Sequence, residues 1–306
     1  MASSFNEQRL AYFFQALRSG TIRAAADELD LAPSAVSRQI ALLEEELGVA
    51  LIERHRRGIM PTEAGQLVAD YYREQQSHQA DLLSKVGELR GLRRGHVAVV
   101  LGEGFVGDLM AAAVAHFGAR HPQISLTLDL AGTNEVIRRV AEDEVEIGLV
   151  YNPPPDARIV TRTRHQQPMH AIVHPRHALA QQARCTLAEV ARVDLGLMHG
   201  AYGTRQLLAL AAYSARLHVE PKVSTNSISV LKHYVMLSHG VTVLPRFAVD
   251  TEIAQGLLVA VPIAEPLFAH AEAHLITRTG RRLSLAASRF VSYSASLMKA
   301  FQVSGD

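Results

Sequence analysis

Ser34, Ser37 and Arg38 stand at the start of a segment whose apolar residues recur with helical spacing. The repeating apolar residues are Val36, Ile40, Leu43 and Leu47. Pro33 suits the first turn of such a helix, because it lacks an N–H and its backbone angle is already helical. Hydroxyl and guanidinium groups can match the donors and acceptors that base edges present in the major groove of DNA. The segment is therefore suited to reading DNA, and an ordinary amphipathic helix with a polar outer face is the alternative.

A second helix is expected just before this segment, over residues 23–29. Its Ala24, Ala25 and Ala26 carry little side chain, so another helix can cross it closely, and Asp30 and Leu31 supply the turn. Two helices joined in this way, the second with an exposed polar start, form the pattern of a helix-turn-helix. Residues 6–19 have apolar residues at helical spacing and predict a first helix that covers the pair.

Arg54, Arg56 and Arg57 lie around Gly58, between two short apolar segments. This arrangement predicts a small basic hairpin, or wing, directly after the helix-turn-helix. Arginines on such a loop can contact phosphates and supply affinity that does not depend on base sequence. We expect Arg23 to contact the backbone in the same way, and a solvated run of charge is the alternative for the hairpin. These elements delimit a predicted DNA-binding domain over residues 1–62.

A long helix is expected from residue 63 to about residue 90, with Thr62 as its N-terminal cap. Its apolar stripe comprises Leu67, Val68, Tyr71, Tyr72, Leu82, Leu83, Val86 and Leu89. A domain of about 60 residues is too small to cover so long a stripe, so we expect the helix to meet a second copy of itself. Residues 63–94, which end in a hinge with Gly91, Arg93 and Arg94, form a predicted linker and dimerisation segment.

Residues 95–306 change to alternating strands and helices. Strands at 96–101, 124–130 and 145–151, with helices at 108–120 and 133–142, predict a parallel sheet covered by helices. After Pro153–Pro155 a second α/β unit follows, and a strand at 268–276 with a final helix at 282–300 is expected to return to the first. The result is a two-lobed α/β domain resembling a periplasmic binding protein. Lobe I is predicted at about 95–162 and 268–306, and lobe II at about 163–267.

The N-terminal segment resembles the LysR-type transcriptional regulators. The matching positions are 25–26, 35–40, 43–48, 51, 53–54 and 62–65. The folding back of the C-terminal part resembles the effector domain of the same family, so the likeness covers nearly the whole chain. At the start of the second helix the family usually has a small hydroxyl residue, a glutamine, and then proline or serine. This chain has Ala32, Pro33 and Ser34 there, so it keeps the docking mode but does not inherit a target sequence.

The resemblance implies a cytoplasmic transcriptional regulator with no enzymatic activity. It would act as a homodimer or homotetramer on a two-fold double-stranded DNA operator, with RNA polymerase as a further partner if it is an activator. A small-molecule effector would bind between the two lobes, where strand ends and helix N-termini favour anions. Through linkage between the two sites, it would change half-site spacing or DNA bending.

The same resemblance places the effector site at two facing walls. The first wall holds Gly102, Glu103, Gly104, Thr133, Asn134 and Tyr151, and the second holds His199, Tyr202, Thr225, Asn226, Ser227 and Val241. Thr133 and Ser227 are equally explained as plain helix caps. Many relatives carry a hydroxyl residue where this chain has Glu103, so the carboxylate is expected to repel an acidic effector or to pair with a cationic one.

One motif points elsewhere, because residues 102–107 read GEGFVG, a literal GxGxxG between a strand and a helix. Asp129 ends the next strand, where it could hold a ribose, so a nicotinamide-dependent oxidoreductase is the alternative function. The chain shows no catalytic constellation to accompany it, and such a motif is common in glycine-rich turns. It would also leave the helix-turn-helix unexplained.

Composition narrows the remaining functions. The 306 residues carry a formal net charge of +1 and a single cysteine, Cys185, which excludes an intrachain disulfide and a thiolate metal cluster. No apolar run approaches the length of a membrane helix, so we expect no membrane partner. The fifteen histidines, among them His165, His170, His174, His177, His270 and His274, are scattered. They do not give the convergent ligands that zinc needs, so neither a metal nor a cofactor is expected.

Overall fold

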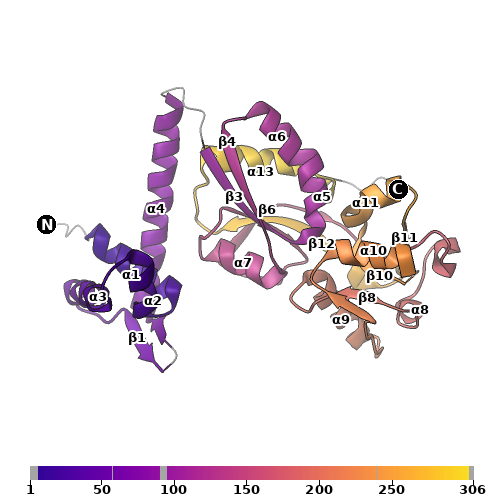
Figure 1. Ribbon diagram of the computed structural model, residues 1–306, viewed down its shortest axis with the longest axis horizontal. Helices are drawn as coiled ribbons and strands as arrows, with labels where there is room; N and C mark the ends of the chain where they lie inside the picture. The colour runs from indigo at the N-terminus through magenta and orange to yellow at the C-terminus, as the bar shows by residue number, and fades with distance from the viewer. Residues whose placement is uncertain (1–5, 57, 90–94, 239, 303–306) are drawn as a thin grey trace. The chain divides into compact units, whose positions relative to one another are not determined.

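The computed structural model describes residues 6–56, 58–89, 95–238 and 240–302. The chain separates into two compact units, Met1–Leu83 and Ser84–Asp306 (Figure 1). Within the described ranges, every helix is too short or too polar to cross a membrane.

The first unit begins with three helices that pack on one another. They are α1 (Glu7–Ser19), α2 (Ile22–Leu29) and α3 (Pro33–Leu47). Thr21 caps α2, because its side-chain oxygen accepts a hydrogen bond from Ala24 N, and Asp30 ends α2 in the left-handed conformation with φ 55°. Leu10, Phe13, Ala25, Ile40 and Leu43 are buried where the three helices meet. The predicted helix-turn-helix and its covering helix are therefore formed.

A two-stranded hairpin and a long helix complete this unit. Strand β1 (Ile52–His55) pairs antiparallel with β2 (Gly58–Pro61), and α4 (Glu63–Leu89) follows. Thr62 caps α4 as expected, since its Oγ1 accepts from Gly65 N at 3.0 Å, and the same hydroxyl donates to Ala50 O at 2.8 Å. A Cβ on Gly65 would lie 2.0 Å from Leu51 O, so only glycine allows α4 to start this close to the hairpin.

Lobe I of the second unit is built on a five-stranded sheet with the order β4-β3-β5-β12-β6. The strands are β3 (Gly95–Leu101), β4 (Ile124–Leu130), β5 (Ile147–Tyr151), β6 (Ile159–Gln166) and β12 (Glu272–Arg278). Strands β3, β4 and β5 are parallel, as predicted. The sheet is mixed rather than wholly parallel, because β12 returns from lobe II and pairs antiparallel with both β5 and β6.

Helices cover both faces of this sheet (Figure 1). Helix α7 (Thr133–Ala141) packs on β5, β3 and β12, while α13 (Leu285–Leu297) packs on β3. The helix expected at 108–120 is divided into a short turn α5 (Val106–Asp108), a π-helical segment (Leu109–Val114) and α6 (Ala115–Arg120). The π-helical segment lies against α13.

Lobe II contains a three-stranded antiparallel sheet and a two-stranded parallel one. The first has the order β10-β7-β11, with β7 (Met169–Val173), β10 (Thr242–Pro245) and β11 (Val259–Pro262). The second pairs β8 (Gly196–Met198) with β9 (Val223–Thr225). A bridge between Leu195 and Val241 joins the two sheets. Helices α9 (Gly203–Ser214) and α10 (Ile228–Ser238) pack on β8 and β10.

Short helices complete lobe II and connect it to lobe I. They are α8 (Leu187–Val190), α11 (Asp250–Ala254) and α12 (Pro266–Ala269), with 3-10 turns at Ala178–Gln181 and Arg246–Val249. A further 3-10 turn, Lys299–Phe301, follows α13 in lobe I.

The chain crosses between the lobes twice, and the two crossings lie side by side. Strand β6 stays paired with β12 up to Gln166, beyond the predicted boundary at residue 162. Phe268, at the start of the strand expected from 268, is instead helical in α12, which contacts α9 and β7 of lobe II. Gln167 N donates to Ala271 O at 2.8 Å, which ties the two crossings together.

Candidate functional site

The start of α3 presents the polar residues that were predicted to read DNA. Pro33 occupies the first turn, and Ala32 precedes it without a side-chain cap. Pro33, Ser34 and Arg38 are exposed, while Ser37 is half-buried. Because Val36 and Ile40 are buried on the opposite face, the helix is fixed with these polar side chains outward.

The hairpin contacts this helix through one polar bond. Arg54 Nη2 on β1 donates a hydrogen bond to Ser37 Oγ at 3.2 Å. Arg54, Arg56 and Arg23 are exposed, the last on α2. Arg57 lies outside the described residues. The helix and the hairpin are joined by this bond. We refer to the residues predicted to contact DNA as the DNA-binding surface: Arg23, Pro33, Ser34, Ser37, Arg38, Arg54 and Arg56.

A cavity of about 40 Å³ lies between the two lobes, with room for a few water-sized molecules. Lobe I lines it with Gly102, Glu103, Gly104, Phe105, Thr133, Val136, Val150 and Tyr151. Lobe II lines it with Met198, Tyr202, Gly203, Thr204, Ile228, Pro245, Phe247 and Ala248. We refer to the space that these residues line as the inter-lobe cavity.

Six of the predicted effector residues line this cavity: Gly102, Glu103, Gly104, Thr133, Tyr151 and Tyr202. The other six, Asn134, His199, Thr225, Asn226, Ser227 and Val241, do not line it. Asn134, His199 and Asn226 are exposed, whereas Val241 is fully buried beside Leu195. Ser227 contributes indirectly, through its bond to Glu103.

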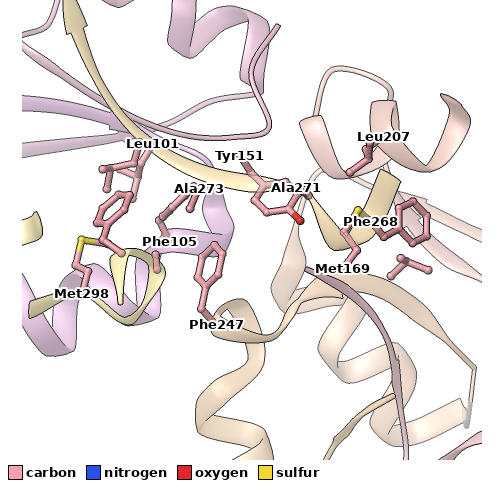
Figure 2. Close-up of a cluster of buried hydrophobic side chains, with 14 of the residues drawn as sticks. Leu101, Phe105, Tyr151, Met169, Leu207, Phe247, Phe268, Ala271, Ala273 and Met298 are labelled. Atoms are coloured by element: carbon pink, nitrogen blue, oxygen red, sulfur yellow. The ribbon is translucent and has the colours of Figure 1, made fainter. Parts of the chain in front are cut away.

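Sequence reasoning missed most of the apolar wall. Phe105 lies in the GxGxxG segment and contacts Phe247 of lobe II, with ring centroids 5.0 Å apart. Phe247 also approaches Tyr151, at 6.4 Å (Figure 2). These residues look like ordinary core positions in the sequence. Only the packing of the two lobes against each other shows that these aromatic side chains line the cavity.

Tyr151 connects the cavity to the crossings. Its hydroxyl donates to Gln167 O at 2.7 Å, and Gln167 Nε2 in turn donates to Lys299 O at 3.0 Å. Burial raises the pKa of Tyr151 well above its ordinary value, so the phenol stays protonated and keeps donating. The cavity wall is thereby fixed to the segment about which the lobes would turn.

Thr133 and Gly203 hold the lobes together at one end of the cavity. Thr133 Oγ1 accepts from Gly203 N at 2.7 Å, and Thr133 N donates to Ala201 O at 2.9 Å. A Cβ on Gly203 would lie 2.0 Å from Tyr151 O, so glycine is required for this approach. Thr133 therefore bonds to the start of α9 across the cleft as well as standing at the start of α7.

Glu103 makes another polar contact between the lobes, at the start of α10. Its Oε1 accepts from Ser227 Oγ at 2.9 Å and from Ser229 N at 3.3 Å, and its Oε2 accepts from Ile228 N at 2.5 Å. Tyr202 lies nearby, and its pKa is raised first by burial and then by the charge of Glu103. The carboxylate of lobe I thus caps a helix of lobe II.

Both parts of the chain match family models. Residues 8–66 match the bacterial regulatory helix-turn-helix protein model of the lysR family, and residues 90–299 match the LysR substrate binding domain. The chain belongs to the LysR family. It is accordingly a DNA-binding transcriptional regulator with an effector-binding domain, and not an enzyme.

Two curated relatives align with nearly the whole LysR-family chain. The HTH-type transcriptional activator CmpR of Synechocystis is 26% identical over 280 residues, covering 90% of each chain. The RuBisCO operon transcriptional regulator of Allochromatium vinosum is 26% identical over 283 residues, covering 92% of this chain and 93% of the relative.

Solved structures share the fold of this LysR-family protein. A full-length OxyR variant from Pseudomonas aeruginosa gives a TM-score of 0.66 at 17% identity, covering 98% of this chain and 95% of that one. Full-length CbnR complexed with its target DNA gives 0.52 at 19% identity, covering 94% and 98%. The CcmR regulatory domain of Synechocystis in complex with 2-PG gives 0.57 at 17% identity, covering 65% and 95%.

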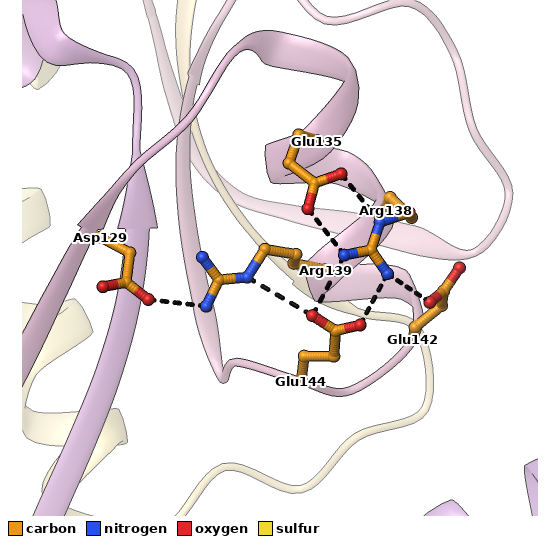
Figure 3. A network of polar contacts seen from close by, with 6 residues as sticks. All are labelled: Asp129, Glu135, Arg138, Arg139, Glu142 and Glu144. Carbon is orange, nitrogen blue, oxygen red and sulfur yellow. Dashed lines mark hydrogen bonds and ion pairs between the residues drawn. The ribbon is translucent and has the colours of Figure 1, made fainter. Parts of the chain in front are cut away.

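The GxGxxG at 102–107 does not make this LysR-family protein a dinucleotide enzyme. Asp129, which that interpretation needs for a ribose, is paired with Arg139 on α7, with Oδ2 and Nη2 2.7 Å apart (Figure 3). Arg138 on the same helix pairs with Glu135, Glu142 and Glu144. Asp129 thus belongs to an ion-pair network. The motif itself forms the loop that brings Glu103 and Phe105 to the cavity.

The histidines do not assemble a metal site in the described part of the LysR-family chain. His274 Nε2 lies 3.0 Å from Glu272 Oε2, and its Nδ1 lies 3.1 Å from Thr161 Oγ1. His270 Nδ1 lies 3.3 Å from Gln166 Nε2. The contact with Glu272 lies within β12, and the contacts with Thr161 and Gln166 reach β6.

Proposed function

We propose that this LysR-family regulator binds a two-fold operator as a homo-oligomer and that a small molecule in the inter-lobe cavity controls the binding. The proposal that an effector binds there rests on one observation. The cavity is lined by both lobes and bridged by polar contacts on two sides, so a ligand in it would affect how the lobes close. A ligand can shift such an equilibrium only by its different affinity for the two states.

The operator half rests on the DNA-binding surface. Arg38 and Ser34 lie exposed at the N-terminal end of α3, where recognition helices contact base edges. Arg54 and Arg56 on the hairpin are suited to the phosphates beside the groove. We propose that Arg57, outside the described residues, contributes in the same way.

The oligomer is supported by α4. Leu67, Tyr71 and Leu82 are 69%, 48% and 60% exposed, and their spacing places them on one face of the helix. An apolar stripe of this kind marks a contact with another chain. A second copy on this stripe would give a dimer with two recognition helices and therefore a two-fold operator, and pairing of dimers would give a tetramer.

Further partners and location follow from the same proposal. If the protein activates transcription, RNA polymerase is a partner, which the name of the activator CmpR favours. The effector is a small molecule, since a regulatory domain of this fold is solved in complex with 2-PG. We propose a cytoplasmic location, because the operator is there.

The test is footprinting of purified protein on fragments of its own genome, with and without fractions of a metabolite extract. We expect protection of a two-fold site, and a metabolite fraction that changes the length of protection or the DNA bend measured by circular permutation. Absence of any preferred fragment overturns the operator proposal. Fractions that bind the protein but leave footprint and bend unchanged overturn the effector proposal.

A further inference from the structure

The helix N-termini at the inter-lobe cavity are already bonded to protein groups. Thr133 N of α7 donates to Ala201 O, and Gly203 N of α9 donates to Thr133 Oγ1. Ile228 N and Ser229 N of α10 donate to the carboxylate of Glu103. Free N–H groups at helix starts would attract an anionic ligand. One of the first N–H donors of α7, one of α9 and two of α10 are thus bonded to the chain itself.

The loop that carries Glu103 is shaped for this contact. Glu103 stands between two glycines, and a Cβ on Gly104 would lie 3.2 Å from Ile228 Cδ1 and 3.4 Å from Ala248 Cβ. The loop can therefore lie directly against lobe II, with the Glu103 side chain at the first turn of α10. Three accepted hydrogen bonds, two of them from backbone N–H groups, satisfy a charged carboxylate well.

The remaining lining of the cavity offers nothing to balance a second negative charge. Among the described residues that line it, Glu103 alone carries a charged side chain, and the others are mainly apolar. An anionic ligand would have to enter beside an existing carboxylate and without a cation among the lining residues. Both the desolvation of its charge and the repulsion from Glu103 oppose this.

We propose that Glu103 is an internal ligand of the inter-lobe cavity that occupies the anion position at α10 and restricts the effector to uncharged or cationic small molecules. The inference rests on the proposed function of the cavity as an effector site. It deepens that function by assigning the class of ligand and the residue that selects it.

The test is chemical rescue, measured by thermal unfolding of the full-length protein without DNA or effector. Glu103→Ala empties the carboxylate position and leaves the donors of Ser227, Ile228 and Ser229 unpaired. We expect a lower Tm that sodium acetate restores in a saturable manner. Sodium chloride at equal ionic strength and uncharged acetamide should not restore it, and the wild-type protein should show no acetate effect beyond that of chloride.

Glu189→Ala is the matched control. Glu189 also caps a helix with its carboxylate, in the capping box with Thr186 at the start of α8, but it does not line the cavity. Its loss should lower the Tm without any acetate rescue. If Glu103→Ala does not fold, Glu103→Ser replaces it, because serine leaves the carboxylate position equally open.

Acetate that fails to raise the Tm of a folded Glu103 variant overturns the proposal, as does equal stabilisation of the wild-type protein or of Glu189→Ala. Because no DNA is present, these outcomes are independent of the footprinting result. If acetate fails to rescue the Glu103 variant but a metabolite still changes the footprint, Glu103 does not select the effector. The proposed function is then unaffected.

Discussion

Arg54 on the wing and Ser37 on the recognition helix are joined by a hydrogen bond from Arg54 Nη2 to Ser37 Oγ at 3.2 Å. The bond uses an acceptor site of the hydroxyl and does not use its proton. It also orients the exposed guanidinium of Arg54 against the helix. The two elements that were predicted separately from sequence are therefore coupled.

Arg38 and Arg54 should differ in how their loss affects operator binding. Arg38→Ala is expected to weaken specific binding by about 1–3 kcal/mol and to relax sequence preference, because we propose that Arg38 contacts a base. Arg54→Ala should weaken binding to all sequences and reduce the salt slope by about one, because we propose that Arg54 contacts a phosphate. Titrations of operator and random DNA over a range of salt concentrations measure both effects.

Arg192 is an exposed arginine of lobe II, and Arg192→Ala serves as the control for these variants. It should change neither the operator affinity nor the salt slope. An unchanged operator affinity in Arg38→Ala would rule out the base contact. Equal loss of specificity in both variants would contradict the division of roles.

The exposed stripe on α4 should determine the oligomeric state. Leu67→Glu combined with Leu82→Glu places charge on the face that we propose to meet a second chain, so the mass should fall to that of a monomer. Sedimentation measures the mass. Gln66→Glu, which adds charge to a different face of α4, should keep the wild-type mass, and a wild-type mass in the double variant would exclude this interface.

His170 should make the protein less stable in mild acid. Burial lowers its pKa, Arg246 lowers it further, and the contact with Pro168 O at 3.0 Å opposes this. The unfolded chain therefore takes up a proton at a higher pH than the folded one. The contribution of His170 to the free energy of unfolding should be constant above about pH 6.5. Below that pH it should decrease, by up to about 1.4 kcal/mol per pH unit.

Urea unfolding of wild-type protein and His170→Asn between pH 5 and pH 7.5 tests this expectation. His274, whose pKa is also lowered by burial, is present in both proteins and so largely cancels in the difference. The advantage of the wild-type protein should shrink as the pH falls. Parallel curves would show that His170 is not protonated on unfolding.

Cys185 should be an unreactive thiol in the native protein. It is 1% exposed, and burial, assisted by the negative charge of Glu189, raises its pKa to about 11. Because the thiolate is the reactive form, a disulfide reagent at pH 8 should react far more slowly with native than with urea-unfolded protein. Cys185→Ser gives the blank. Rapid labelling of the native protein would contradict the burial of Cys185.

The sequence predicted the helices and the hairpin of the first unit well, because their determinants are local. The spacing of Val36, Ile40 and Leu43 fixes which face of α3 is buried. Pro33 marks a helix start by its fixed backbone angle, and Thr62 marks one by its bond to Gly65 N. Such signals need no knowledge of distant segments. The contact between Arg54 and Ser37, in contrast, required the hairpin to be placed against the helix.

The lobes were predicted less completely, for a related reason. Strand β6 contains Arg162 and Arg164, so its polar sequence hides an edge strand that only its pairing with β12 reveals. Strand β12 runs antiparallel to β5, because the chain re-enters lobe I at the crossing beside Gln167. The residue types within one segment cannot specify which distant segment it pairs with.

The sequence by itself determined the recognition helix, the wing and the alternation that builds two lobes, because periodicity, caps and turns act over a few residues. Only the tertiary structure decided which residues face one another across the cleft. Glu103 meets Ser227 and Ile228, and Thr133 meets Gly203, because folding brings together helix starts and loops that are far apart along the chain. These contacts decide which groups line the proposed effector site.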